Sequence, residues 1–284
     1  MRPLLPSMGL MRVLDLFSGI GGFSLGLERA GMQTVAFCEI EPYPRAVLRK
    51  HWPNVPCYED VRTLTAERLN ADGIGPIDVI CGGFPCQPFS QAGKQLAEKD
   101  VRHLWPEYFR LVKECRPSWV IGENVIGLIN LGLDAVLDDL EGIGYATRTF
   151  DIPACAVGAP HYRRRVWITA NATSGGRASG FNGDTKSIDV VSYSEDLAYS
   201  DCPLLQGGGG GNNEEGRKES SRYARLACGE PESTWEIEPG MGRVANGVPS
   251  RVDRIKALGN AVVPQIPEII GRAIMSVHNQ GEHP

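Results

Sequence analysis

The sequence predicts an α/β fold in which helices cover both faces of an open sheet. Short apolar runs rich in β-branched residues alternate with helix-like stretches. Three of these runs end in informative residues: 12–17 leads into glycines, 34–38 ends at an acid, and 77–81 ends in Gly82-Gly83. Open α/β sheets bind ligands at the carboxyl ends of their strands. We therefore expect these three strand ends to form one site.

A glycine-rich turn follows the first strand. Residues 18–22 read Ser-Gly-Ile-Gly-Gly, and 24–30 has the pattern of a helix, so the turn and the helix N-terminus suit a polar or anionic ligand group. Glu39 follows the second strand at the spacing of about twenty residues typical of dinucleotide folds, where the acid binds ribose hydroxyls. Asp60, at the end of a short strand in 57–61, suits an adenine amino group. The spacing predicts an adenosine site, although a tight strand-to-helix turn without a ligand would look similar.

The third strand end carries one thiol. The loop reads Gly82-Gly83-Phe84-Pro85-Cys86-Gln87-Pro88-Phe89-Ser90, and its two prolines restrict the backbone on either side of Cys86. A free cysteine is more often an inert core residue. A thiol on a rigid loop at a strand's carboxyl end is, however, placed as a nucleophile would be.

The next segments are expected to bring further polar side chains to the same edge. A helix is predicted over 105–115 and a strand over 118–122, which delivers Glu123-Asn124-Val125. An isolated Glu after a strand is more often a solvated loop residue. A helix over 133–142 and a strand over 145–152 follow. In the extended segment after them, Arg163 and Arg165 face one side and Arg164 the other, because side chains alternate along a strand.

Taken together, these motifs resemble the DNA cytosine-5 methyltransferases of bacterial or phage type. Residues 15–22 match the first motif of that family, Asp-x-Phe-x-Gly-x-Gly-Gly, and Pro-Cys and Glu-Asn-Val match its two catalytic motifs. Residues 161–165 match Gln-x-Arg-x-Arg, with His161 in the Gln position, and Gly-Asn-Ala-Val-Val-Pro at 259–264 matches the final motif. The resemblance covers roughly 11–170 and 235–280, with all five motifs in family order.

The resemblance implies a Rossmann-like, S-adenosylmethionine-dependent methyltransferase sheet with helices on both faces, plus a small irregular target-recognition region. It implies three parts: a catalytic and cofactor-binding domain at 11–170, a partly disordered recognition region at 171–234, and a segment at 235–284 that returns to the catalytic domain. The amphipathic run 266–277 would form the last helix and close the cofactor pocket.

The resemblance also implies the reaction and the residues that perform it. Cys86 would add to carbon 6 of a flipped-out cytosine in duplex DNA, and a protonated Glu123 would bind ring nitrogen 3. Arg163 and Arg165 would contact the base and a phosphate, and Ser90 would also contact DNA. The expected S-adenosyl-L-methionine ligands are Phe17, Gly19, Gly21, Gly22, Glu39, Asp60, Val61, Pro85, Leu104, Asn260 and Val262. No metal is expected.

Composition is ordinary for a globular enzyme, with 42% hydrophobic and 22% charged residues in 284. No apolar run approaches the ~20 residues of a membrane span, and the eight cysteines include no Cys-x-x-Cys pair. We therefore expect a cytoplasmic protein, in a bacterial cell or a phage-infected host, with reduced thiols. The net charge of −5 does not indicate a DNA-binding protein. Basic residues nevertheless cluster at 163–165, 217–225 and 243–256.

The segment from Asn171 to about Ser233 changes character. Gly, Ser, Asn and Glu dominate it, and 207–211 is a pure glycine run. It falls where the family carries target recognition, and an inert flexible insert is about as good an interpretation of its glycine core. The expected partner is double-stranded DNA. A cognate restriction endonuclease would act on the same site without forming a complex, no membrane partner is expected, and the protein would be a monomer.

Three other functions fit part of the sequence. An oxidoreductase with an adenine-containing cofactor would use the glycine-rich turn but would leave Pro-Cys-Gln-Pro and Glu-Asn-Val without a role. A catalytically inactive DNA-binding protein would not need the complete set of chemical residues. An RNA cytosine methyltransferase of the same fold is the closest rival, and methyl transfer to DNA and RNA in parallel separates all of these.

Overall fold

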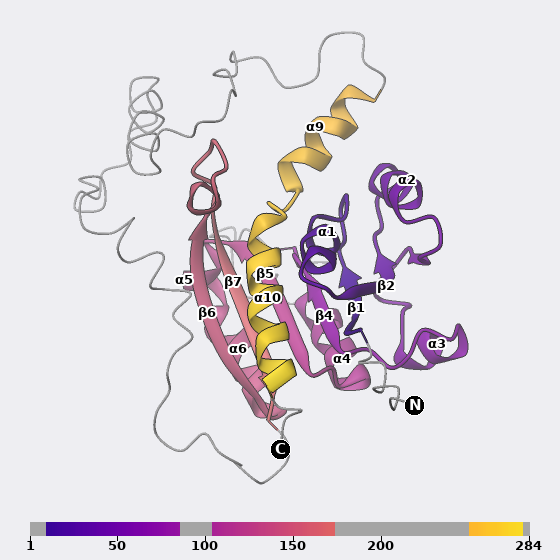
Figure 1. The fold of residues 1–284 in the computed structure, drawn as a ribbon, viewed down its shortest axis with the longest axis vertical. Coiled ribbons are helices and arrows are strands. Elements are labelled where there is room, and N and C mark those ends of the chain that lie inside the picture. Colours follow the sequence, from indigo (N-terminus) through magenta and orange to yellow (C-terminus); the bar gives the residue numbers. More distant parts are fainter. Residues whose placement is uncertain (1–9, 86–103, 174–249, 281–284) are drawn as a thin grey trace, which may run out of the picture.

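The structure is a computed structural model that describes residues 10–85, 104–173 and 250–280 (Figure 1). Its strands form one seven-stranded sheet in the order β3-β2-β1-β4-β5-β7-β6. These strands are β1 (Arg12–Leu16), β2 (Gln33–Cys38), β3 (Cys57–Tyr58), β4 (Val79–Gly82), β5 (Trp119–Val125), β6 (Tyr145–Pro153) and β7 (Arg164–Ala172). The predicted α/β sheet is confirmed.

The sheet is parallel except at one edge. β1 pairs in parallel with β2 and β4, β3 with β2, and β5 with β4, whereas β7 runs antiparallel between β5 and β6. β7 pairs with β5 as far as Val125, with Glu123 opposite Trp167. The predicted end of this strand at residue 122 was therefore wrong, because the ladder with β7 keeps Glu123, Asn124 and Val125 inside β5.

The helices are α1 (Gly22–Arg29), α2 (Pro42–His51), α3 (Ala66–Ala71), α4 (Trp105–Cys115), α5 (Leu128–Leu131), α6 (Leu133–Gly142), α9 (Arg251–Asn260) and α10 (Gln265–Gln280), with a 3-10 turn, η2, at Ala154–Val157. The predicted helices over 105–115 and 133–142 are confirmed. α1 begins slightly earlier than predicted, and α10 is slightly longer at both ends. α9 lies where no helix was expected. None of the helices among the described residues combines the length and apolarity needed to cross a membrane.

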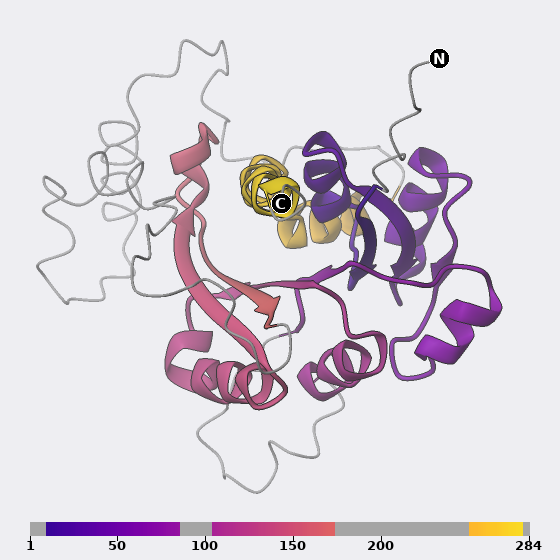
Figure 2. The same cartoon turned by 60° about the horizontal axis from the view of Figure 1, so that its bottom comes forward.

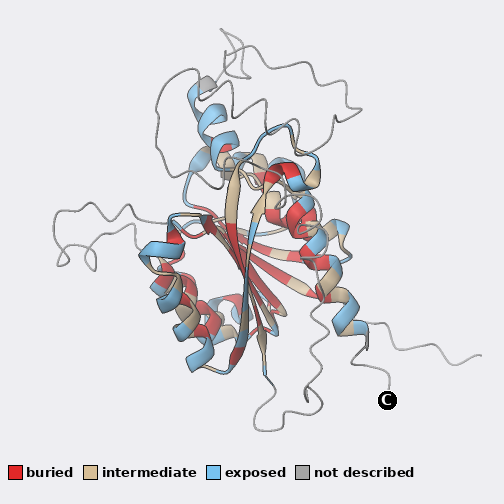
Figure 3. Cartoon of the chain, turned by 90° about the vertical axis from the view of Figure 1, so that its left-hand side faces the viewer, coloured by how far each residue is buried: buried red, intermediate tan, exposed pale blue. Residues whose placement is uncertain are grey.

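Helices cover both faces of the sheet, as Figure 2 shows. One face packs against α4 and α6 through buried residues such as Leu14, Leu111 and Leu140. The other packs against α1 and α10 through residues such as Val13 and Ile270. Neighbouring residues of β1 enter opposite cores because side chains alternate along a strand. The central strands are accordingly buried on both sides (Figure 3).

The last helix packs directly on the first helix of the chain. An added Cβ at Gly26 of α1 would lie 2.3 Å from the carbonyl oxygen of Pro264, and one at Gly271 of α10 would lie 2.8 Å from Cβ of Ala30. Only glycine permits this approach, because real Cβ atoms do not come so close to other heavy atoms. The packing brings the segment before α10 to the glycine-rich turn that follows β1.

Candidate active site

The turn between β1 and α1 is built from left-handed backbone. Phe17, Gly19 and Gly21 have φ of 53°, 53° and 87°, and the main-chain N–H of Gly21 donates to the carbonyl of Ser18 over 2.9 Å. Gly22 and Val262, two of the expected cofactor residues, lie against each other. An added Cβ at Gly22 would lie 2.8 Å from the Val262 carbonyl oxygen. At Gly19, by contrast, an added Cβ would meet no atom of the described residues within 4 Å. Among those residues, the turn is open on the Gly19 side and closed by the C-terminal segment on the Gly22 side.

Glu39 is brought onto this turn, as its spacing predicted. It follows β2 and is only 8% exposed. Its two carboxylate oxygens accept main-chain hydrogen bonds, Oε2 from Gly19 and Oε1 from Glu41, each over 2.8 Å. Each carboxylate oxygen can accept a second bond. Glu39 is therefore held rigidly beside the open face of Gly19 with acceptor capacity for the hydroxyl groups of a ribose.

Asp60 and Val61, the next two expected cofactor residues, already have partners within the protein. The Asp60 carboxylate is paired with the Arg62 guanidinium through contacts of 2.8–3.1 Å, and hydrogen bonds from Arg62 lower its pKa. An adenine amino group would have to share this carboxylate with Arg62. Val61 is buried in the core, and its carbonyl accepts from Arg110 over 2.9 Å. The Val61 side chain therefore packs in the core beneath the loop that follows β3.

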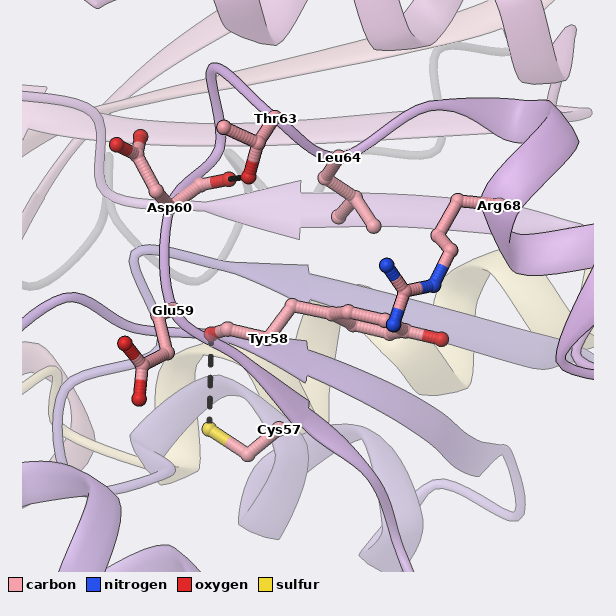
Figure 4. Close-up of a pocket in the computed structure, with 7 residues that line it drawn as sticks. All are labelled: Cys57, Tyr58, Glu59, Asp60, Thr63, Leu64 and Arg68. Carbon is pink, nitrogen blue, oxygen red and sulfur yellow. Dashed lines mark hydrogen bonds between the residues drawn. The ribbon is translucent and has the colours of Figure 1, made fainter.

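A hollow of about 400 Å³ opens beside Asp60, between the loop after β3 and α3 (Figure 4). Within it the Arg68 guanidinium lies over the Tyr58 ring, 5.7 Å from the ring centre, and the Tyr58 hydroxyl donates to Asp72 over 2.7 Å. In Figure 4 the Asp60 carboxylate points away from Tyr58 and Arg68. The hollow therefore lies next to the expected adenine position, with its polar groups already paired.

The remaining expected cofactor residues lie on three separate segments. Leu104 precedes α4 and is half-buried, while Pro85 and Asn260 are exposed. Val262 is half-buried and packs against the core that holds α1. The expected nucleophile Cys86 and the expected DNA contact Ser90 lie outside the described residues.

The loop that leads to Cys86 is fastened by a residue that the sequence analysis did not assign. Asn124 in β5 is 3% exposed, and its Nδ2 donates to the carbonyl of Phe84 over 2.9 Å. Its Oδ1 accepts the main-chain N–H of Val125, also over 2.9 Å. Asn124 therefore ties β5 to the residue two positions before Cys86. Its place next to Glu123 in the Glu-Asn-Val motif was the one available signal for this role.

Glu123 and the two expected arginines converge at the carboxyl end of β5. The Nε atom of Arg165 lies 3.1 Å from Oε1 of Glu123. Burial raises the pKa of Glu123, and the charges of Arg165 and then Arg163 oppose that rise. An added Cβ at Gly83 would lie 3.0 Å from Glu123 Oε2, so the backbone that follows β4 and leads to Cys86 runs directly past this carboxyl.

The middle arginine faces the other way, as the strand alternation predicted. Arg164 pairs with Asp151 of β6, whereas Arg163, just before β7, donates to the carbonyl of Gly259 over 2.6 Å. Burial is the largest cause that lowers the pKa of Arg163, followed by the charge of Arg165. Main-chain N–H of His161 donates to the Ala159 carbonyl over 2.8 Å. One edge of the sheet thus carries two arginines and an acid whose pKa is raised by burial of most of its side chain.

This arrangement suits chemistry on a polar ring. A protonated Glu123 can donate a hydrogen bond to a ring nitrogen, and the arginines can neutralise oxygen or phosphate charge beside it. In the described ranges no three His, Cys, Asp or Glu side chains come together in a way that could hold a metal ion.

Comparison with known proteins places this geometry in a family. The chain is 39% identical over 162 residues to the Type II methyltransferase M.NgoMIV of Neisseria gonorrhoeae, which covers 55% of this chain and 50% of that relative. It is 35% identical over 166 residues to M.AgeI of Thalassovita gelatinovora, covering 56% and 39%. The chain therefore spans half or less of the length of these curated relatives.

Solved structures agree on the fold. A candidate DNA modification methyltransferase encoded within an E. coli prophage is 32% identical with a TM-score of 0.51, over 58% of this chain and 47% of that one. The Dnmt2 methyltransferase of S. pombe is 23% identical with a TM-score of 0.52, over 65% and 56%, a likeness of fold alone. The family model of C-5 cytosine-specific DNA methylases matches residues 11–196, well over half of the sequence, and the chain belongs to that family.

Proposed function

We propose that the protein is a DNA cytosine-5 methyltransferase that transfers the methyl group of S-adenosyl-L-methionine to carbon 5 of a flipped-out cytosine in duplex DNA. The observation that carries the proposal is the largely buried carboxyl of Glu123. It lies 3.1 Å from Arg165 and directly beside Gly83, the first residue of the loop that leads to Cys86. A nucleophile, an acid of raised pKa and two cations at one strand edge match the needs of addition to a cytosine ring.

The glycine turn and its neighbours fit the methyl donor. Glu39 would accept hydrogen bonds from ribose hydroxyls, and the open face of Gly19 leaves room for the ligand against the backbone. Val262 closes the other side of the turn. When bound there, the cofactor supplies an electrophilic methyl group. The chain's part is to hold it near the Cys86 loop and to exclude water from the site.

The Cys86 thiolate would begin the reaction by forming a bond to carbon 6 of cytosine. Electron density then moves toward ring nitrogen 3, and Glu123 quenches it by donating its proton there. Carbon 5 becomes nucleophilic and would take the methyl group from the cofactor sulfonium, which would leave as a neutral thioether. The ring nitrogen would return its proton to Glu123, and loss of the carbon 5 proton to solvent would restore the double bond and expel the thiolate. During these steps the hydrogen bond from Asn124 to the Phe84 carbonyl would hold the Cys86 loop beside Glu123.

The partners follow from the same proposal. Duplex DNA would lie against the edge that carries Arg163 and Arg165, with residues 171–234 as the target-recognition region. We propose that the protein acts as a monomer in the cytoplasm, and that a restriction endonuclease recognises the same sequence without binding this protein. The names of the relatives, Type II methyltransferases, support a restriction-modification setting. Light scattering on the purified protein, with and without duplex DNA, tests the monomer.

Methyl transfer from radiolabelled cofactor tests the function directly. Wild-type protein is expected to label duplex DNA and not RNA, and nuclease digestion should release the label as 5-methylcytosine. Glu123→Gln keeps the size of the side chain but cannot supply an acidic proton, so its rate should fall by about two decades or more. Label in RNA alone, or in a base other than cytosine, would contradict the proposal.

A further inference from the structure

A single buried residue is bonded to both ends of the glycine-rich turn. Asp15 lies in β1, one residue from its end, and none of its surface is exposed. Its main-chain carbonyl accepts from the hydroxyl of Ser18 over 2.6 Å, where the turn begins. Its carboxyl Oδ2 accepts from the hydroxyl of Ser24 over 2.7 Å, in the first turn of α1. The glycines of the turn lie between these two serines.

This attachment replaces an ordinary helix cap. The N-cap residue of α1 is Gly21, which has no side chain to bond the free N–H groups of the first turn. Asp15 reaches Ser24 from the neighbouring strand instead, and both the hydroxyl and the main-chain N–H of Ser24 act on its carboxyl. The geometry of the turn therefore depends on a side chain outside it.

The other carboxyl oxygen indicates which protonation state is present. Asp15 Oδ1 is buried and has no N–H or O–H partner among the described residues, and the only other donor that acts on the carboxyl is the weak S–H of Cys81. An ionised carboxylate with one bare oxygen in an apolar interior is costly, whereas a neutral acid is much less so. Burial is the largest cause that raises the pKa of Asp15, to about 7, against the hydrogen bonds from Ser24 and a smaller effect of the Cys81 thiol.

Among the residues that the structure describes, the ionisable groups that couple to Asp15 add no positive charge. They are Glu39 at the end of β2, the thiols of Cys38, Cys57 and Cys81, and the phenol of Tyr108. Glu39 raises the pKa of Asp15 further. Because Glu39 also holds Gly19, the two acids act on the same turn from its two sides.

We propose that Asp15 is a positioning residue that holds the glycine-rich turn in its cofactor-binding shape as a neutral carboxylic acid, with Oδ2 bonded to Ser24 and the proton on Oδ1. The role rests on the proposed function, because the turn is where that function binds its cofactor. Ionisation at higher pH leaves a buried charge that the fold relieves by loosening the turn. Cofactor affinity should therefore weaken as pH rises through neutrality.

Amide hydrogen exchange of residues 18–26 in the cofactor-free protein tests the role without any binding step. After correction for intrinsic rates, exchange in the wild type should rise about fivefold or more between about pH 6 and about pH 8.5. Asp15→Asn mimics the neutral acid and should remove this rise. Asp15→Ala should exchange fast at both pH values. Asp78→Asn is the matched control, since Asp78 accepts the Arg12 N–H at the opposite end of the same strand, and it should behave as the wild type.

Calorimetry with S-adenosyl-L-methionine gives the second readout. The wild-type Kd should weaken about fivefold or more over the same pH range, and the Asp15→Asn value should change by less than about twofold. A wild-type pH dependence that persists in Asp15→Asn, in exchange or in affinity, overturns the proposal. So does protection of the turn in Asp15→Ala equal to that of the wild type. If no variant binds the cofactor, the proposed function fails, and the exchange data still decide the role of Asp15.

Discussion

Arg165 and Glu123 form an ion pair at the carboxyl end of β5, with Nε and Oε1 3.1 Å apart. Two opposing effects act on the pKa of the Glu123 carboxyl. Burial favours the proton on Glu123, and the neighbouring guanidinium favours its loss. The outcome is that the pKa of Glu123 lies above its ordinary value, which favours the protonated carboxyl that the proposed function needs. The pairing also fixes the direction in which the carboxyl points.

The pH dependence of activity should report this balance. Because Glu123 must be protonated, kcat/KM should fall as pH rises through its pKa. Arg165→Ala removes the largest charge that lowers this pKa, so the falling limb should move to higher pH while the maximal rate drops. Arg164→Ala is the matched control, because Arg164 pairs with Asp151 and should leave the limb in place. A limb that moves to lower pH in Arg165→Ala would contradict the account.

Asn124→Ala should slow turnover by separating the Cys86 loop from β5. The variant loses the bond to the Phe84 carbonyl and leaves that oxygen buried without its donor, at a cost of about 1–3 kcal/mol. We expect kcat to fall more than tenfold, with cofactor affinity little changed. Asn124→Asp keeps the size but replaces the donor with an acceptor, so it should not restore the rate. Steady-state kinetics and cofactor calorimetry on both variants provide the check, and unchanged kcat in Asn124→Ala would refute the positioning role.

Glu39→Ala should weaken cofactor binding. It removes charge-assisted hydrogen bonds to the ligand and also releases the Gly19 N–H, so the expected loss is about 1.5–3 kcal/mol. Asp60→Ala should cost less, because the Asp60 carboxylate is already engaged by Arg62. Calorimetry separates the two. Equal affinity in the wild type and both variants would mean that the cofactor binds elsewhere.

The basic residues of the expected recognition region should act on DNA and not on folding. Replacing Arg217, Lys218, Arg222 and Arg225 by Ala should leave Tm nearly unchanged, lower DNA affinity and flatten its dependence on salt, because phosphate contacts release counterions. These residues lie outside the described ranges. Unaltered DNA binding and salt dependence would make the segment an inert insert and would transfer recognition to the basic cluster at 243–256.

The sheet could be predicted from local patterns because each strand is bounded by its own turn signals. The glycines after β1 and the acid after β2 follow two neighbouring parallel strands, so their spacing predicts that they lie together. Glu39 does accept a hydrogen bond from Gly19. The continuation of β5 through Glu123 could not be predicted in this way, since it depends on an antiparallel ladder with β7, far along the chain. The roles of Asn124 and Asp15 could not be predicted from the sequence for a similar reason. Both act through partners, Phe84 and Ser24, that only the packed sheet brings into contact.

Capture of the covalent intermediate tests the central claim most directly. Duplex DNA that carries 5-fluorocytosine at the methylated position should trap the protein, because fluorine cannot leave as a proton does and the Cys86 bond to carbon 6 cannot be released. On a denaturing gel, the wild type with S-adenosyl-L-methionine should run as a DNA-linked species, and peptide mapping should place the link at Cys86. Cys86→Ser should give none and should retain less than about a tenth of the wild-type rate on ordinary DNA. A wild-type protein that methylates cytosine without forming the adduct, or a Cys86→Ser variant that still forms it, would contradict the account.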